Sequence, residues 1–187
     1  MSFNEVNPVR RSRQNIETPL LVLGGARSGK SAWAESVVGR LAPPYIYIAT
    51  AQPLDEEMKL RIEQHRERRK GGQWETIESP IDLCGALESL KDMHKAVLVD
   101  CISLWLNNLL CSTKVTEAEA AVDAVCAVIE AVDYPLVIVS NDTGGGIVPD
   151  NALARRFQDL CGLTNQKLAR ICASVFLVTA GLPLRLK

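Results

Sequence analysis

The sequence contains no apolar run that approaches the length of a membrane span, so we expect no transmembrane segment. It also lacks an excess of positive charge, because 21 Lys and Arg residues face 22 Asp and Glu residues and leave a formal net charge of -1. Nucleic-acid-binding proteins usually carry a basic field, so this balance argues against a nucleic-acid partner. Arg10, Arg11 and Arg13 precede no apolar core, which excludes a secretory signal in this segment.

Cysteine and histidine occur at spacings that match no recognisable zinc site. The six cysteines form no CxxC pair, and the two histidines complete no Cys/His ligand set with them. All six cysteines lie in or beside apolar segments. We therefore expect buried free thiols in a reducing cytoplasm, and neither disulfides nor a cysteine-bound metal.

Apolar residues make up 47% of the 187 positions, which is enough for one compact core. The arginine-containing residues 1–18 are predicted to form a disordered tail. Residues 19–187 show no repeat, low-complexity tract or linker. We predict a single catalytic domain over this second range.

Short apolar runs alternate with helical patterns along residues 19–187. Buried strands are predicted at 20–25, 45–50, 96–101, 136–140 and 175–179, the last of these being the final strand, with a shorter strand at 74–78. Helices are predicted at 30–41, 55–70, 81–90, 104–110, 116–133 and 151–173, the last as one helix or a helix pair. Thr116 with Glu119 fits a capping box. Strands covered on both faces imply an α/β fold, a three-layer sandwich with a mainly parallel sheet, of the P-loop NTPase (RecA-like) type.

One segment between a predicted strand and a predicted helix matches the phosphate-binding pattern G-x-x-x-x-G-K-[ST] at every required position: Gly24, Gly25, Ala26, Arg27, Ser28, Gly29, Lys30 and Ser31. Its glycines let backbone N–H groups turn toward phosphate oxygens, and the following helix points its positive end at the same place. Lys30 can reach the β and γ oxygens, and the Ser31 hydroxyl can ligate Mg²⁺. The segment predicts binding of a nucleoside triphosphate.

Asp100 closes the buried run at 95–100 and is the carboxylate that a phosphate loop needs on a second strand. It would hold Mg²⁺ directly or through water. The alternative is a strand-end residue that caps the helix beginning near Ser103.

The charged segment 55–70 is predicted to be a helix whose first turns pack on the sheet through Leu54, Met58 and Ile62, whereas its later turns cannot. Helical spacing places Arg61, His65, Arg68 and Arg69 on one face.

Positive charge around an imidazole lowers the pKa of that imidazole, so His65 is expected to be neutral. A neutral imidazole is a competent nucleophile, and arginines bind phosphate well. The alternative is a solvated helix surface with an idle histidine.

Further motifs follow the phosphate loop in order: YIAT at 47–50, R-I-x-x-H-x-x-x-R at 61–69, DC at 100–101 before LWLNNLL at 104–110, GIVP at 146–149, LARRF at 153–157 and NQxLA at 165–169. With this set the chain resembles the bifunctional adenosylcobinamide kinase/adenosylcobinamide-phosphate guanylyltransferase family of cobalamin biosynthesis. The resemblance extends from about residue 20 to the C-terminus.

The resemblance implies two reactions. A nucleoside triphosphate, ATP or GTP, phosphorylates the aminopropanol hydroxyl of adenosylcobinamide. GTP then guanylylates an enzyme histidine, and the GMP passes to the cobinamide phosphate to give adenosyl-GDP-cobinamide. The family is typically a homotrimer, which implies an oligomer here.

Carried over by position, the resemblance implies that His65 is the guanylylated residue and that Lys30 and Asp100 are catalytic. Mg²⁺ would be bound by Ser31 and Asp100. The implied nucleotide contacts are the phosphate loop, Ala49, Thr50, Ala51, Arg66, Glu67, Arg68, Arg69, Glu78 and Asp100.

One departure falls before the GIVP motif. The family commonly has Asn-Glu-Val-Gly there, and this chain has Asn141-Asp142-Thr143-Gly144, which keeps a carboxylate but shortens its reach. Two other functions fit the phosphate loop alone: a P-loop kinase for a different small molecule, which would leave the His65 face unused, and a nucleotide-binding module without catalysis. Labelling of the protein by α-labelled GTP would distinguish the transferase from the kinase, and acceptor-dependent turnover would distinguish it from the non-catalytic module.

Overall fold

The sheet has seven strands, in the order β3-β2-β4-β5-β1-β6-β7. A computed structural model describes residues 16–112 and 115–187. The strands are β1 (Leu20–Gly24), β2 (Tyr45–Ala49), β3 (Trp74–Glu78), β4 (Ala96–Asp100), β5 (Leu136–Asn141), β6 (Ser174–Thr179) and β7 (Leu182–Arg185). All neighbours pair in parallel except β6 and β7. The predicted mainly parallel sheet is confirmed, but β6 is not the final strand.

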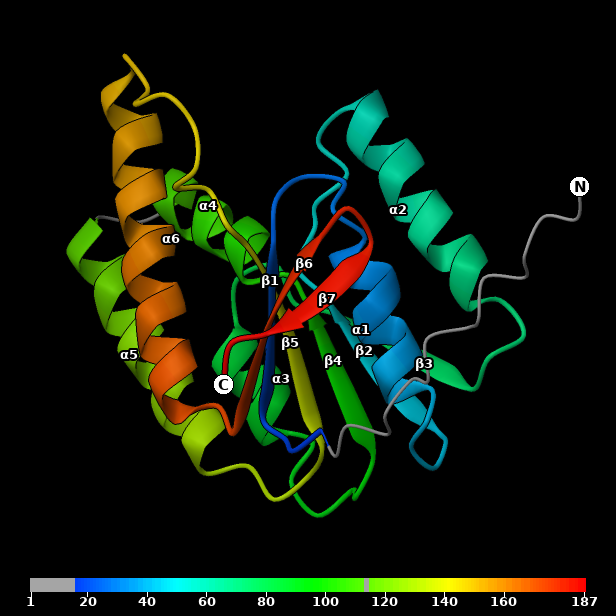
Figure 1. The fold of residues 1–187 in the computed structure, drawn as a ribbon. Coiled ribbons are helices and arrows are strands. Elements are labelled where there is room, and N and C mark those ends of the chain that lie inside the picture. Colours follow the sequence, from blue (N-terminus) through cyan, green and yellow to red (C-terminus); the bar gives the residue numbers. More distant parts are fainter. Residues whose placement is uncertain (1–15, 113–114) are drawn as a thin grey trace, which may run out of the picture.

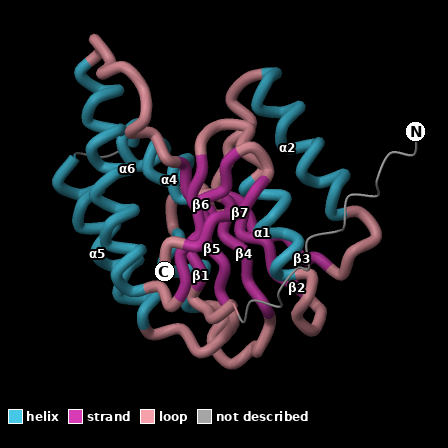
Figure 2. Tube along the Cα trace, in the orientation of Figure 1, coloured by secondary structure: helices cyan, strands magenta, loops and turns pink. Residues whose placement is uncertain are grey.

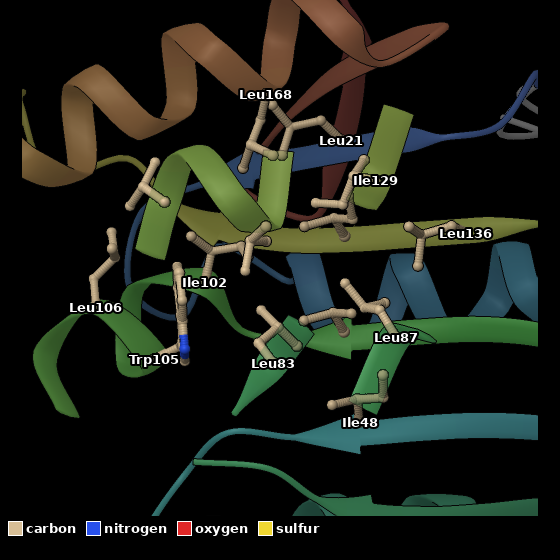
Figure 3. Packing of buried hydrophobic residues seen from close by; sticks show 14 of the residues in the cluster. Leu21, Ile48, Leu83, Leu87, Ile102, Trp105, Leu106, Ile129, Leu136 and Leu168 are labelled. Atoms are coloured by element: carbon tan, nitrogen blue, oxygen red, sulfur yellow. The ribbon is translucent and has the colours of Figure 1, made fainter. Parts of the chain in front are cut away.

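Helices cover both faces of the sheet, as Figure 1 shows. One face carries α3 (Leu83–Glu88), α4 (Ile102–Ser112), α5 (Val115–Glu130) and α6 (Ala152–Ile171), and α1 (Lys30–Val38) packs on the other. The larger core joins Ile48 and Leu136 of the sheet with Leu87, Ile129 and Leu168 of the helices in one apolar cluster (Figure 3). The three-layer α/β prediction is therefore confirmed. Strands that lie between two helical layers need apolar side chains on both faces, which explains the apolar runs of the sequence.

Helix α2 (Glu56–Arg69) stands away from the sheet in Figures 1 and 2. Every residue of α2 is described, and Arg69, in its last turn, is the one that is buried. Leu54 exposes 76% of its surface, and the half-buried Met58 and Ile62 belong to neither hydrophobic core. The prediction that the first turns pack on the sheet is therefore wrong, because α2 contacts the body of the protein through charged side chains at its C-terminal end.

Several helix boundaries differ from those predicted. Helix α1 ends at Val38, three residues early, and α6 is a single helix that begins after Asn151, whose side chain accepts hydrogen bonds from two backbone N–H groups. Thr116 lies inside α5, because this helix already begins at Val115, so the predicted capping box is wrong.

Of the predicted tail, residues 1–18, positions 1–15 lie outside the described residues. Ile16 packs against the core on the α1 face, and Glu17 donates its backbone N–H to Ser174 Oγ at 3.3 Å.

All six cysteines are free; three are buried, two are half-buried and Cys111 is exposed. In the described part of the chain, no helix is both long and apolar enough to cross a bilayer.

Candidate active site

The phosphate loop joins β1 to α1 at the carboxyl edge of the sheet. Gly29, which precedes α1, has a φ of 92°, a conformation that glycine adopts without strain. A side chain at Gly24 would meet Ser28 Oγ at 2.5 Å and the Val178 carbonyl oxygen at 2.6 Å. Both glycines of the pattern, Gly24 and Gly29, are therefore required, one by close packing and the other by backbone conformation.

Lys30 folds back over the phosphate loop. Its Nζ donates a hydrogen bond to the Gly25 carbonyl oxygen at 3.0 Å. Burial lowers the pKa of Lys30, and the nearby Asp100 carboxylate opposes that shift. Phosphate oxygens in the loop would give this ammonium group a stronger partner than a carbonyl.

The hairpin between β6 and β7 packs against the phosphate loop. The Gly181 backbone N–H donates to the Ser28 carbonyl oxygen at 2.8 Å, and a side chain at Gly29 would lie 3.2 Å from Gly181 Cα. On the other side, the Asp142 N–H donates to the Gly24 carbonyl oxygen at 3.0 Å. Backbone contacts from two distant segments thus hold the loop, and no side-chain pattern in the sequence signals them.

Asp100 ends β4 with its side chain buried beneath the cleft. Its Oδ2 accepts a hydrogen bond from the Tyr47 hydroxyl at 3.1 Å. The next residue, Cys101, exchanges two hydrogen bonds of 2.8 Å with Thr50 Oγ1, one through its N–H and one through its carbonyl oxygen. Asn108 of α4 donates to the Thr50 carbonyl oxygen at 2.8 Å. These bonds fix the end of β4 and thereby the position of the Asp100 carboxylate.

His65 points from α2 toward Asp100. Its Nδ1 lies 3.0 Å from Arg68 Nη2, 3.6 Å from Asp100 Oδ2 and 3.9 Å from Glu35 Oε1. Because arginine only donates, Nδ1 accepts from Arg68 in this arrangement.

The pKa of His65 is lowered, as predicted, but burial is its main cause and the neighbouring arginines come after it. The Asp100 carboxylate opposes the shift. The physical reason is that the ring is withdrawn from water at the C-terminal end of α2, which a helical wheel does not reveal.

The arginines of α2 have distinct partners. Arg69 is buried, with its guanidinium 3.4 Å from the centroid of the Tyr47 ring. Arg66 pairs with Glu78 of β3 at 2.7 Å. Charge and stacking therefore hold the C-terminal turns of α2 over β2 and β3.

A cleft of about 640 Å³ brings most of the predicted residues together. Its lining includes Ala26, Arg27, Ser28, Gly29, Lys30, Ser31, Ala49, Ala51, His65, Arg66, Arg68, Arg69, Glu78 and Asp100. Gly24, Gly25, Thr50 and Glu67 do not line it.

The structure explains why two of these four residues do not line the cleft. Thr50 is fully buried and bonded to Cys101, and Glu67 pairs with Lys70 at 2.7 Å on the exposed side of α2. Sequence reasoning also missed Tyr47, Thr76 and Cys101, which line the cleft. Burial raises the pKa of the Cys101 thiol to about 11, so this cysteine is protonated at neutral pH.

Ser31 and Asp100 both line the cleft, and hydroxyl and carboxylate oxygens are donors that suit a magnesium ion. A hydroxyl and a carboxylate on one cleft are the pair that a phosphate loop offers to Mg²⁺, which takes its remaining ligands from phosphate and water. Among the described residues, no group of three or more His, Cys, Asp or Glu side chains is placed to hold a metal without such help.

Comparison with solved structures supports the fold. The chain superimposes on a protein from Pyrococcus horikoshii OT3 solved in a structural study of PH0250, with a TM-score of 0.52 and 11% identity, over 90% of this chain and 85% of that one. At this identity the likeness concerns the fold alone.

Sequence comparison is more specific. The bifunctional adenosylcobalamin biosynthesis protein CobP of Pseudomonas aeruginosa is 41% identical over 167 residues, which are 89% of this chain and 96% of that protein. The CobU proteins of Salmonella typhimurium and Escherichia coli, described by the same function, are 37% and 35% identical over 90% of this chain and 99% of each relative. The model of the family described as cobinamide kinase / cobinamide phosphate guanyltransferase matches residues 20–186, and this chain belongs to that family.

Proposed function

We propose that this chain phosphorylates adenosylcobinamide with a nucleoside triphosphate and then transfers GMP from GTP, through His65, to the cobinamide phosphate. The observation that carries the proposal is that His65 lines the same cleft as the phosphate loop and the Asp100 carboxylate. A P-loop kinase of other specificity would have no use for a histidine held there.

The nucleotide binds with its phosphates in the loop at 24–31. Backbone N–H groups and Lys30 contact the phosphate oxygens, while Arg66, Arg68 and Arg69 approach from α2. Ala49, Ala51 and Glu78 line the part of the cleft beyond the loop. Thr50 positions the end of β4 from behind the cleft. Glu67 lies beside the nucleotide-binding arginines on the exposed side of α2.

His65 attacks the α-phosphorus of GTP through Nε2, since the ring contacts within the described residues all fall on Nδ1. Arg68 turns from Nδ1 to a phosphate oxygen, and Nδ1 then carries the ring proton toward Asp100. A nitrogen–phosphorus bond forms, the bond between the α-phosphorus and its bridging oxygen breaks, and pyrophosphate leaves. Asp100 stabilises the positive charge that develops on the imidazole.

The second half of the transfer regenerates His65. A phosphate oxygen of the cobinamide phosphate attacks the phosphorus of the phosphoramidate, and the nitrogen–phosphorus bond breaks. Mg²⁺, held by Ser31 and Asp100, would supply positive charge to the phosphate oxygens. Lys30 and the arginines of α2 carry out the same task for the leaving pyrophosphate.

We also propose that the chain works as a homo-oligomer, by resemblance a trimer, in the cytoplasm. Strand β7 supports oligomer formation, because it is a sheet edge with exposed Leu182 and Leu184. The six free cysteines support a location in the cytoplasm. The predicted single domain over 19–187 stays part of this proposal.

Trapping with α-labelled GTP and Mg²⁺ tests the function. Wild-type protein is expected to take up label that is lost in acid and kept in base, as a phosphoramidate is, and His65→Ala is expected to take up none. His94→Ala is the matched control, because His94 is the second histidine and is exposed in the loop before β4, outside the cleft. It should label like wild type.

Added adenosylcobinamide phosphate should discharge the label into a corrinoid product. Wild-type protein that binds GTP but never becomes labelled would contradict the transferase proposal. Equal labelling of wild type and His65→Ala would move the covalent site elsewhere.

A further inference from the structure

Helix α2 lacks an apolar anchor on the rest of the protein. Arg69, its buried residue, presents a guanidinium, Leu60 is exposed, and the half-buried Met58 and Ile62 belong to neither hydrophobic core. A helix without a buried apolar face is not held by the hydrophobic effect. The position of His65 therefore depends on the charged contacts of the last two turns of α2.

Glu35 makes more of these contacts than any other carboxylate in the described part of the chain. It lies on α1, five positions after Lys30, and its side chain is 13% exposed. Its Oε1 lies 3.5 Å from Arg69 Nη1 and 3.9 Å from His65 Nδ1, and its Oε2 lies 3.5 Å from Arg68 Nε. Asp100 contacts His65 alone among these three, and Glu78 contacts Arg66.

The charges around Glu35 explain why this contact matters. Burial raises the pKa of Glu35, and Arg68 and Arg69 oppose that shift. Two guanidinium groups held near one another beside a phosphate loop that carries Lys30 would repel without an anion between them. A carboxylate satisfies them, whereas a neutral amide of the same shape cannot.

We propose that Glu35 is a positioning residue that docks α2 on α1 and thereby sets His65 in the cleft. This inference rests on the proposed guanylylation of His65. The three separations of 3.5–3.9 Å exceed those of good hydrogen bonds, and Arg69 Nη1 has no hydrogen-bond partner among the described residues. Glu35 therefore acts on Arg68, Arg69 and His65 mainly through its charge and not through short hydrogen bonds.

The test compares Glu35→Gln with wild type in two reactions. At saturating α-labelled GTP, the rate of His65 labelling should fall about tenfold or more, because a helix that has lost its docking anion places His65 in the cleft only part of the time. At saturating ATP, the rate of adenosylcobinamide phosphorylation should fall less than the rate of labelling, by about threefold at most, because Lys30 and the backbone of the phosphate loop still hold the nucleotide when the arginines of α2 move away. Glu35→Asp keeps the charge with a shorter reach, so its rate of labelling should lie between those of wild type and Glu35→Gln.

Hydrogen exchange supplies a readout independent of activity. Amides of α2 in Glu35→Gln should lose about tenfold in protection, while those of β1, β4 and β5 should keep theirs. Glu56→Gln is the matched control, because Glu56 lies on α2 and pairs with Lys59 in solvent, and it should behave as wild type in every assay.

Three results would overturn the inference. One is labelling of Glu35→Gln at the wild-type rate, and another is unchanged exchange in α2. The third is an equal fall of both reactions in Glu35→Gln and in Glu35→Asp, which would mean that α1 and its loop are damaged. Absence of label on wild-type protein is a different outcome, because it contradicts the guanylyltransferase proposal and not the docking of α2.

Discussion

His65 Nδ1 lies 3.6 Å from Asp100 Oδ2, so a largely exposed helix and a fully buried strand meet in the cleft. The carboxylate is fixed by Tyr47 and by the backbone that follows it, while the helix that carries the imidazole is held by ion pairs and by the stacking of Arg69 on Tyr47. The acid is therefore the rigid partner of the pair, and the histidine is the adjustable one.

Replacing Asp100 by Asn is expected to lower both cobinamide phosphorylation and GMP transfer. The amide removes a metal ligand and the charge that stabilises the imidazolium, and each such electrostatic contact contributes about a hundredfold to the rate. The measurement is kcat for each half-reaction at saturating nucleotide. Asp92→Asn, in an exposed turn, is the control. Loss of only one half-reaction would mean that Asp100 serves a single step.

The pH dependence of labelling is expected to follow the protonation of His65. Neutral imidazole is the reactive form, so the rate is flat above the pKa of His65 and falls below it. Because that pKa is lowered from 6.5, the acid limb of wild type should lie below pH 6.5. The Arg68 charge contributes to the lowering, so Arg68→Gln should move the limb to higher pH. A wild-type limb at or above pH 6.5 would contradict the assigned environment of the ring.

The buried strands could be predicted because of how parallel sheets are covered. A strand with helices on both faces, such as Ala96–Asp100, needs apolar side chains in succession, and that pattern is local in the sequence. Strand β7 gave no such signal. It is exposed, contains Pro183 and, among the described strands, pairs with β6 alone, so its formation depends on that neighbour and not on its own composition.

The candidate site was predictable to a different extent. The phosphate loop has a fixed local pattern, and Asp100 follows from it as the carboxylate on a second strand. Glu35 and Tyr47 could not be found that way, because their importance comes from α2, which approaches them from a distant part of the sequence. For the same reason a search for apolar periodicity assigned the wrong end of α2 to the contact with the protein.

The close packing of Gly24 leads to a prediction about stability. Alanine at this position would place Cβ within 2.6 Å of Ser28 Oγ and of a β6 carbonyl oxygen, and we expect Gly24→Ala to cost about 1–3 kcal/mol. Gly25→Ala meets nothing within 4 Å and should change stability by about 0.5 kcal/mol or less. Urea unfolding followed by circular dichroism gives both values. Equal stability of the two variants would show that the loop relaxes around the added methyl group.

Thr50 provides a test of positioning through the backbone. Valine has nearly the shape of threonine, but in Thr50→Val the Cys101 N–H loses its acceptor at a fully buried position, which should cost about 1–3 kcal/mol. Since Cys101 follows Asp100, we expect kcat of both half-reactions to fall by about tenfold while nucleotide affinity changes little. Thr50→Ser keeps the hydroxyl and should retain most of the activity despite the lost methyl group. If Thr50→Val binds nucleotide much more weakly and Thr50→Ser does not, the hydroxyl contacts the nucleotide directly, and the family-derived role of Thr50 would be correct in place of the positioning role.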